Sequence, residues 1–342
     1  MSMNRIPTPG SGRITLALLA IVPAVMAYPW RTPRDYWLLG IAAAVVIVLF
    51  GWWGGLYWTT ILRRRLAMIG RGNAVPAATS DAAATALIRL GAPDNDSDVL
   101  PLPLIASYLD RYGIRADKIR ITSRDNAADP SRRETWIGLT VSAPDNLAAL
   151  QARSPRIPLR ETAQVAARRL ADHLREIGWE ATTVAADDIP RLLTSNPRER
   201  WRGVQRGASD YLAAYQIQVD GALPETLHAI RAYDARETCT ALEVAGDKSR
   251  PTVAVACAFQ TETAPDGKAP VDGLTPQRGN HLPALTALDL LSTYRLDGHT
   301  AAPEDLLSQL HWPTLTGAAH RAPRGETGGG AESADTVEVV RT

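Results

Sequence analysis

The longest charge-free segment of the chain runs from Tyr36 to Leu62, twenty-seven residues without Asp, Glu, Lys or Arg. A second segment, from Ile14 to Trp30, has seventeen. At ~1.5 Å per helical residue the two would cover roughly 40 Å and roughly 25 Å, and the hydrocarbon core of a bilayer is about 30 Å thick. The pattern therefore predicts two membrane spans, at about 14–30 and 36–62.

Arginine residues mark the ends of these segments. Two precede the first and four follow the second, while two arginines and one aspartate lie between them (Arg5 and Arg13; Arg63, Arg64, Arg65 and Arg71; Arg31, Arg34 and Asp35). The positive-inside rule then places both ends of the pair, and the rest of the chain, in the cytoplasm. A cleaved signal peptide is an alternative for the first segment, and the second span alone would still leave the remainder cytoplasmic.

Each segment also carries small residues at helical spacing, which let two helices approach closely. They are Ala17, Ala20, Ala24 and Ala27 in the first segment, and Gly40, Ala44, Gly51 and Gly55 in the second. Gly51 and Gly55 form a G-x-x-x-G step. These stripes predict either a seam between the two spans or a contact with the helices of a partner.

Charge is distributed unevenly along the chain. Residues 1–75 carry eight Arg and one Asp, a net charge of +7, and the remainder carries −6. An acidic body argues against nucleic-acid binding, which normally requires a strongly basic domain. The densest basic cluster outside the N-terminal region comprises Arg198, Arg200, Trp201, Arg202 and Arg206. It is interpreted either as an exposed loop or, together with Arg63, Arg64 and Arg65, as a contact with lipid headgroups or an acidic partner.

The remainder of the chain has the pattern of a mixed globular domain. Apolar residues recur at helical spacing from Leu159 to Ile177, ahead of Gly178. Strands are predicted at 118–124, 135–141, 211–219, 237–245 and 252–260, and shorter helices at 104–112 and 224–233. Because strands and helices do not alternate regularly, we expect an α+β fold rather than a doubly wound parallel sheet.

The two cysteines lie on the strands of the last predicted hairpin, around the turn at 246–249. If Leu242 and Val255 share a buried face, paired residue numbers must sum to an odd number, and Cys239 then faces away from Cys257. We therefore expect two buried thiols and no disulfide.

Sequence signatures of catalysis are absent. The chain has no G-x-G-x-x-G, no Walker A sequence, no G-x-S-x-G and no H-E-x-x-H. Asp94, Asp96 and Asp98 imitate the start of a calcium loop, but Val99 and Ile105 stand where Gly and Glu are required. We predict no enzyme activity, no cofactor, no metal and no small-molecule substrate.

These patterns divide the chain into five parts. They are a cytoplasmic N-terminus (1–13), a transmembrane hairpin (14–62), a basic juxtamembrane linker (63–79), a cytoplasmic α+β domain (80–316) and a disordered tail (317–342). Three consecutive glycines and several acidic residues give the tail its disordered composition. The expected protein is thus a multi-pass protein of the cytoplasmic membrane.

This arrangement resembles the EccE family, the E component of the membrane complex of type VII (ESX) secretion systems. The similarity is one of pattern and covers most of the chain to about residue 316. It rests on the paired spans with their arginines, on 133–142 (RETWIGLTVS), on 159–179 (LRETAQVAARRLADHLREIGW) and on 211–219. Among family members, the one serving the third ESX system is the most similar.

The resemblance implies partners rather than a reaction. These are the B component, the C component with its FtsK/SpoIIIE-like ATPase, the multi-span D component with a ubiquitin-like domain, and membrane lipid. The exported cargo would be helical-hairpin proteins of the WXG and PE/PPE kinds. Two alternatives are a membrane-anchored transferase that uses carboxylates such as Asp94 and Asp96, and a membrane-tethered signalling scaffold.

Overall fold

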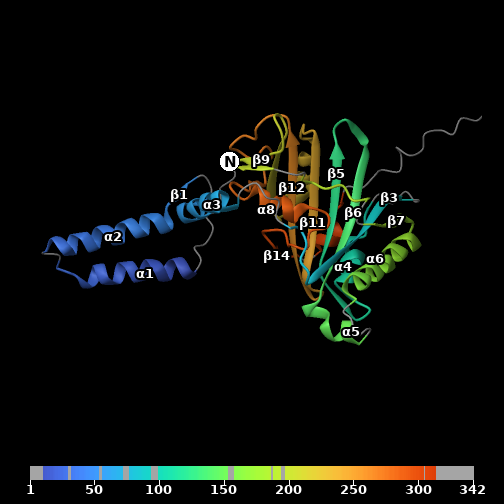
Figure 1. Ribbon diagram of the computed structural model, residues 1–342, viewed down its shortest axis with the longest axis horizontal. Helices are drawn as coiled ribbons and strands as arrows, with labels where there is room; N and C mark the ends of the chain where they lie inside the picture. Colours follow the sequence, from blue (N-terminus) through green and yellow to red (C-terminus); the bar gives the residue numbers. More distant parts are fainter. Residues whose placement is uncertain are drawn as a thin grey trace, which may run out of the picture.

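The computed structural model describes residues 11–29, 32–53, 56–71, 77–93, 99–152, 158–185, 188–193, 197–303 and 305–312. Two N-terminal helices, α1 (Ser11–Met26) and α2 (Pro33–Phe50), lie side by side and project from a body built on a β-sheet (Figure 1). A third helix, α3 (Trp58–Arg71), lies between this helical arm and the body.

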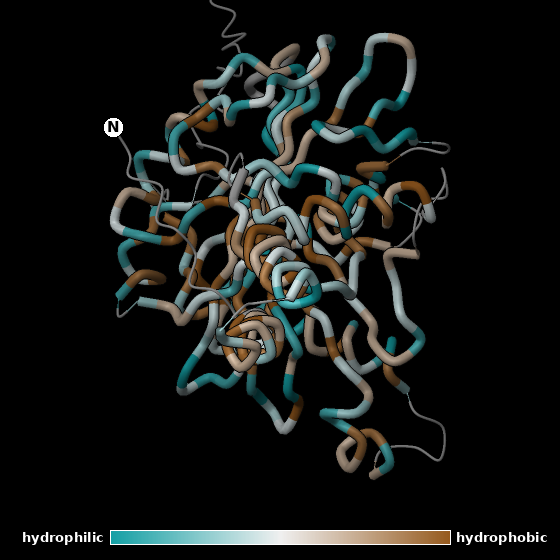
Figure 2. Tube along the Cα trace, turned by 90° about the vertical axis from the view of Figure 1, so that its left-hand side faces the viewer, coloured by the Kyte–Doolittle hydropathy of each residue, from teal (hydrophilic) through white to brown (hydrophobic). Residues whose placement is uncertain are grey.

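Small apolar residues pack α1 against α2. Ala17 and Ala24 of α1 are buried, as are Ala42 and Leu49 of α2, although most other side chains of the two helices are exposed. Viewed from the side of the arm (Figure 2), the helices are seen nearly end-on and are coloured mostly as apolar residues. The exposed apolar surface of the arm is thus large for a protein surrounded by water.

The charge-free segment 36–62 is not a single helix, contrary to the prediction. α2 ends at Phe50, and the Gly51 N–H donates to the Ile47 carbonyl (2.7 Å). The elements that follow are β1 (Trp52–Trp53), β2 (Leu56–Tyr57), which pairs with it, and α3. Aromatic residues favour strands and consecutive glycines favour turns, so local preference interrupts the apolar run.

Among the helices of the described residues, α2 alone has the length and composition to cross a membrane. The apolar part of α1, Ile14–Met26, is shorter. At ~1.5 Å per residue, the eighteen residues of α2 reach about 27 Å, close to the thickness of the hydrocarbon core. One apolar N-terminal helix of spanning length is therefore established.

The body contains one large antiparallel sheet, which confirms a mixed α/β architecture. Its strand order is β7-β3-β6-β5-β11-β12-β10-β9-β8. The bounds are β3 Ala83–Pro93, β5 Ile114–Asn126, β6 Asp129–Ser142, β7 Trp179–Val184, β8 Arg198–Arg200, β9 Gly203–Gln205, β10 Tyr211–Ile217, β11 Glu237–Asp247 and β12 Arg250–Thr261. Three short strands pair beside this path: β4 (Asp110–Arg111), β13 (Leu274–Pro276) and β14 (Thr300–Ala301).

Helices cover both faces of the sheet. The body helices are α4 (Leu102–Ala106), η1 (Ser107–Leu109), η2 (Pro144–Asn146), α5 (Leu147–Gln151), α6 (Leu159–Glu176), α7 (Leu223–Ala232), α8 (His281–Leu288) and α9 (Leu306–Gln309). α6 and α7 bury their apolar sides with Leu242 and Val255, while α8 packs with Ala241 and Ala256 of the same two strands. Neighbouring residues of a strand point to opposite faces, so α8 lies on the face opposite α6 and α7.

Several predicted elements are confirmed. The long helix is α6, and it ends before Gly178, whose φ of +88° suits glycine. In the last hairpin Cys239 pairs with Ala258, and Thr240 with Cys257, so the paired numbers sum to 497. Both thiols are buried in different cores and neither is in a disulfide.

Two other predicted elements differ from the structure, and two predictions lie outside the described residues. The segment 104–112 is not one helix, because α4 and η1 end before β4. Part of the predicted linker, up to Arg71, belongs to α3. Asp94, Asp96, Asp98 and the predicted tail lie outside the described residues.

Candidate functional site: the junction of helical arm and body

The described residues contain no group of three or more His, Cys, Asp or Glu side chains arranged to hold a metal ion. Burial raises the pKa of Cys239 to about 11 and the pKa of Cys257 well above its ordinary value, so both thiols stay protonated near neutral pH. The described residues do form contacts between distant segments, and the basic clusters take part in them.

The two basic clusters identified in the sequence meet where α3 reaches the body. Arg64 of α3 donates a hydrogen bond to the carbonyl oxygen of Arg278 (2.7 Å). The guanidinium of Arg65 lies 5.5 Å from the ring centroid of Trp201, in the β8–β9 connection. A cation–π contact and a charge-assisted hydrogen bond together attach the arm to the body.

Gly279 makes this close approach possible. Its φ is +65°, a conformation that favours glycine, and its N–H donates to the Trp201 carbonyl (2.9 Å). A Cβ at this position would lie 2.4 Å from the Trp201 ring and 3.2 Å from the Cβ of Arg64. Any larger residue would push the junction apart.

A cavity of about 810 Å³ lies at the junction, lined by Arg63 and Arg64 of α3, by Gln216 of β10 and by residues of α8 and the segment after it. Nearby, His281 is fully buried, and its Nδ1 accepts a hydrogen bond from the Ala214 N–H (3.1 Å). Burial, and then the positive charges of Arg64 and Arg278, lower the pKa of His281 to about 3. The imidazole is therefore neutral, with its proton on Nε2.

The remaining arginines of the second cluster divide into two sets. Arg198, Arg200 and Arg202 are exposed at the edge of the sheet, while Glu199 between them accepts a hydrogen bond from the Leu282 N–H (3.1 Å) at the start of α8. Arg206 differs from the exposed set.

The Arg206 side chain is 11% exposed and stabilises the fold locally. It donates to the Leu192 carbonyl (3.0 Å) and forms an ion pair with Asp210 (Nε–Oδ2 3.0 Å). Both of its terminal nitrogens donate within the fold, so the structure gives Arg206 a local role, and its predicted contact with lipid or a partner stays a prediction.

The small residues of the arm also differ in burial. Ala17 and Ala24 are buried against α2, and Ala20 between them is half-buried. Gly40 and Ala44 are instead exposed on another side of α2, along a shallow groove formed with Tyr36, Trp37 and Ile41. Gly51 caps the end of α2, and Gly55 lies outside the described residues. Gly51 therefore lies at the end of α2 rather than within it, and the predicted packing of the G-x-x-x-G step stays a prediction.

A buried ion cluster lies on the strand predicted at 118–124, and the sequence pattern did not predict it. Glu243 of β11 is fully buried and pairs with Arg120 (2.5 Å) and Lys118 (3.5 Å) of β5. Its other oxygen accepts hydrogen bonds from the Leu296 N–H and from His299 Nε2 (both 3.0 Å). Lys and Glu are common at protein surfaces, so their presence on adjacent strands does not indicate burial. Here they are buried because the segment after α8 covers them.

The cluster fixes the segment that follows α8 onto the sheet. Arg120 donates to the carbonyls of Tyr294 (2.7 Å) and Asp289 (3.2 Å), and Lys118 also donates to Tyr294. Burial alone would raise the pKa of Glu243, but Arg120, His299 and Lys118 lower it to about 2. Burial and the charge of Arg120 lower the pKa of Lys118 to about 7, against the effect of Glu243.

Fold and candidate sites together define a class: an α+β protein carried on an apolar N-terminal helix of membrane-spanning length, whose prominent sites are contact surfaces. Comparison with known proteins agrees. Residues 129–217, which include β6, α6 and β10, match the family model for the type VII ESX secretion system translocon protein EccE.

Full-length relatives extend the match. The ESX-3 secretion system protein EccE3 of Mycobacterium tuberculosis strain H37Rv is 62% identical over 325 residues, which cover 94% of this chain and 98% of the relative. The protein of the same name from Mycolicibacterium smegmatis is 49% identical over 294 residues, 86% of this chain and 92% of the relative. The chain belongs to the EccE family of type VII secretion components, as the pattern of its sequence predicted.

Proposed function

We propose that this chain is the E subunit of an ESX-3 type VII secretion complex and that it acts as a structural, non-catalytic component. The observation that carries the proposal is the 62% identity over 94% of the chain to relatives named as ESX-3 secretion system proteins. A body with an ordinary core and contact surfaces at its junction supports a scaffolding role.

The proposed topology is a multi-pass anchor with a cytoplasmic body. In this topology α1 and α2 form a hairpin in the membrane. The apolar part of α1 is short, so the bilayer would thin locally around it. The arginines that follow α2 favour the cytoplasm. Arg63, Arg198, Arg200 and Arg202 are exposed and would meet acidic headgroups or an acidic partner.

The proposed partners are the B, C and D components of the same complex, and the C component supplies the ATPase. In this arrangement the E subunit supports assembly and the export of WXG and PE/PPE proteins. The body domain would extend from about residue 80 to the end of the packed region, where Trp312 is buried and donates to Ser123 Oγ (3.0 Å).

Deleting the gene should abolish or strongly reduce export of the helical-hairpin cargo, measured by immunoblotting of culture filtrate. Complementation with the Asp94→Asn, Asp96→Asn, Asp98→Asn variant should restore export fully. Asn keeps the size and turn preference of Asp but removes its charge, so a scaffold is unaffected whereas an acid-dependent or metal-dependent enzyme fails. If the complex assembled normally with that variant but exported no cargo, the scaffold proposal would be wrong and an enzymatic or metal-dependent role would take its place.

Gly40→Leu should reduce co-purification of the complex while leaving the fold intact. A Cβ at Gly40 would meet no atom within 4 Å, so the isolated subunit has room for the side chain. If the exposed groove beside Gly40 and Ala44 packs against a partner helix, the added bulk separates the backbones by several ångströms and removes close van der Waals contact. Affinity purification from membranes measures the loss.

A matched control lies two residues along the same helix. Ala42 is buried against α1, so Ala42→Leu should disturb the hairpin itself and lower the amount of inserted subunit. Full recovery of the complex with Gly40→Leu would show that this side of α2 faces lipid.

A further inference from the structure

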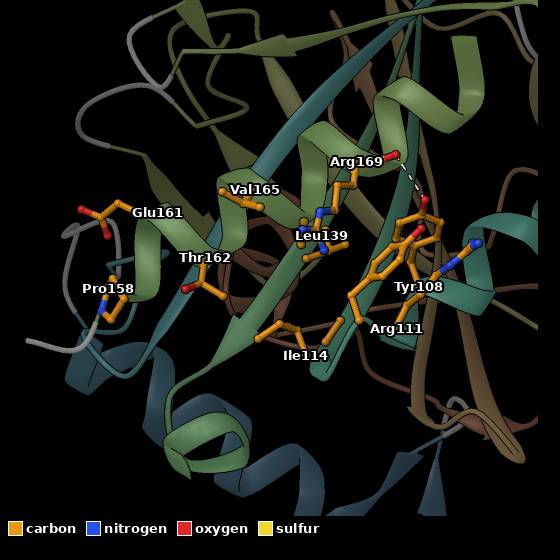
Figure 3. Close-up of a pocket in the computed structure, with 12 residues that line it drawn as sticks. Tyr108, Arg111, Ile114, Leu139, Pro158, Glu161, Thr162, Val165 and Arg169 are labelled. Atoms are coloured by element: carbon orange, nitrogen blue, oxygen red, sulfur yellow. Dashed lines mark hydrogen bonds between the residues drawn. The ribbon is translucent and has the colours of Figure 1, made fainter. Parts of the chain in front are cut away.

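A small cavity opens beside α6, far along the chain from the arm. It has a volume of about 270 Å³ and lies between the first turns of α6 and strands β5 and β6 (Figure 3). Pockets for cofactors and drug-sized ligands usually have about 300–1,000 Å³. This cavity therefore suits one or two side chains rather than a cofactor.

At one end of the cavity two arginines lie over two tyrosine rings, and these four side chains are called the stack here. The Arg111 guanidinium lies 4.6 Å from the ring centroid of Tyr108 and 5.2 Å from that of Tyr112. The Arg169 guanidinium lies 4.7 Å from the Tyr112 centroid, and the Tyr108 hydroxyl donates to the Arg169 carbonyl (3.2 Å). Ring faces hold the two guanidinium planes and leave N–H edges available for an anion.

No carboxylate of the described residues forms an ion pair with the arginines of this stack. Within the part of the chain that the structure describes, neither Arg111 nor Arg169 has a carboxylate oxygen within 4 Å. Arg111 does approach His173 Nδ1 and Ser107 Oγ, each at 3.4 Å. Neither contact supplies negative charge, so the stack attracts an acidic group.

The floor of the cavity is apolar. Ile114 and Leu139 line it from the sheet, and Val165 lines it from α6 (Figure 3). Val165 and Tyr112, at its rim, are 44% and 55% exposed. Exposed apolar side chains around a concave surface are typical of a protein contact site.

The backbone holds Tyr112 in place. Its φ is +57°, and the following Gly113 has a φ of +69°. Arg111 pairs with Ile114, so Tyr112 and Gly113 are the two central residues of the β4–β5 hairpin turn, and a type I′ turn requires a positive φ at both. The hairpin therefore fixes the backbone that carries the Tyr112 ring.

We propose that this cavity binds an acidic segment of a partner protein, in which an apolar side chain stands next to carboxylates. The apolar side chain fills the space above Leu139 and Ile114, and the carboxylates meet Arg111 and Arg169. Glu161 and Pro158 lie at the opposite end (Figure 3), so the charge of the cavity also orients the segment. This site is independent of the membrane anchor and of the role proposed above.

The test uses the full-length protein in detergent and the fluorescein-labelled peptide Glu-Asp-Leu-Phe-Asp-Glu, with fluorescence polarisation as the readout. The charge-reversed peptide Lys-Lys-Leu-Phe-Lys-Lys serves as the ligand control. We expect saturable binding of the acidic peptide alone, weakened about tenfold or more in Arg111→Glu and in Arg169→Glu. Arg169→Lys should bind with intermediate affinity, because it keeps the charge but loses the planar stack.

Arg168→Glu is the matched protein control, since Arg168 is exposed on the same helix but does not line this cavity. It should bind the peptide as the unmodified protein does, and near-UV circular dichroism should show that all variants are folded. No saturable binding at millimolar peptide, equal binding of the basic peptide, or equal losses in Arg168→Glu and Arg169→Glu would each overturn the proposal.

Discussion

Replacing Glu243 with Ala should lower the free energy of unfolding by about 3–5 kcal/mol, because Lys118 and Arg120 would stay buried without their carboxylate. The segment after α8 would also lose its acceptor for the Leu296 N–H and for His299. Urea unfolding of the full-length protein in detergent, followed by circular dichroism, measures the change.

Two comparisons distinguish a buried network from a general effect of lost charge. Replacing Glu243, Lys118 and Arg120 together by Met should recover much of the stability, because no uncompensated charge remains. Arg89→Ala removes a partly exposed pair with Glu134 and should cost about 1 kcal/mol or less. If Glu243→Ala cost no more than Arg89→Ala, the cluster would not be holding the covering segment.

Acidification should destabilise the body in two overlapping pH windows. The pKa of His281 is about 3 in the folded protein and 6.5 ordinarily, so the unfolded chain takes up the proton first. The stability from neutral, buried His281 is complete above about pH 6.5 and is lost as the pH falls toward 3. Each pKa unit corresponds to about 1.4 kcal/mol, so the loss reaches a few kcal/mol. Glu243 adds a second loss between its ordinary pKa of 4.5 and its folded pKa of about 2.

The variant His281→Asn isolates the first window. Its amide oxygen can still accept from the Ala214 N–H but does not titrate, so the melting temperature should stay nearly constant from pH 6.5 to 4.5. His311→Asn, at an exposed histidine, should keep the slope of the unmodified protein. An unchanged slope in His281→Asn would place the acid sensitivity elsewhere.

Local patterns predicted much of the body well. The apolar spacing of α6 and its end at Gly178 depend on neighbours within a few residues, so both can be recognised from the sequence. The register of β11 and β12 followed from the same logic, because only one parity buries Leu242 with Val255. The family resemblance was likewise visible in the order of spans, arginines and helix.

Absence of charge was a weaker guide to helix length. It located the N-terminal apolar region correctly but did not reveal that α2 ends at Phe50, since hydropathy does not report the competing strand preference of Trp52 and Trp53. Strands β3 and β7 were also missed, because β3 is rich in alanine, which is depleted in strands, and β7 is short with few large apolar side chains.

The sequence by itself determined the apolar arm, the α+β class, the main helix and the separation of Cys239 from Cys257, because each follows from periodicity or local charge. Only the tertiary structure decided that Arg64 and Arg65 meet the loop of Trp201, more than a hundred residues away, and that Lys118, Arg120 and Glu243 are buried. A charged residue on a strand has the same sequence signature whether water or a covering segment lies above it. Its burial depends on where a distant segment packs, which no local pattern records.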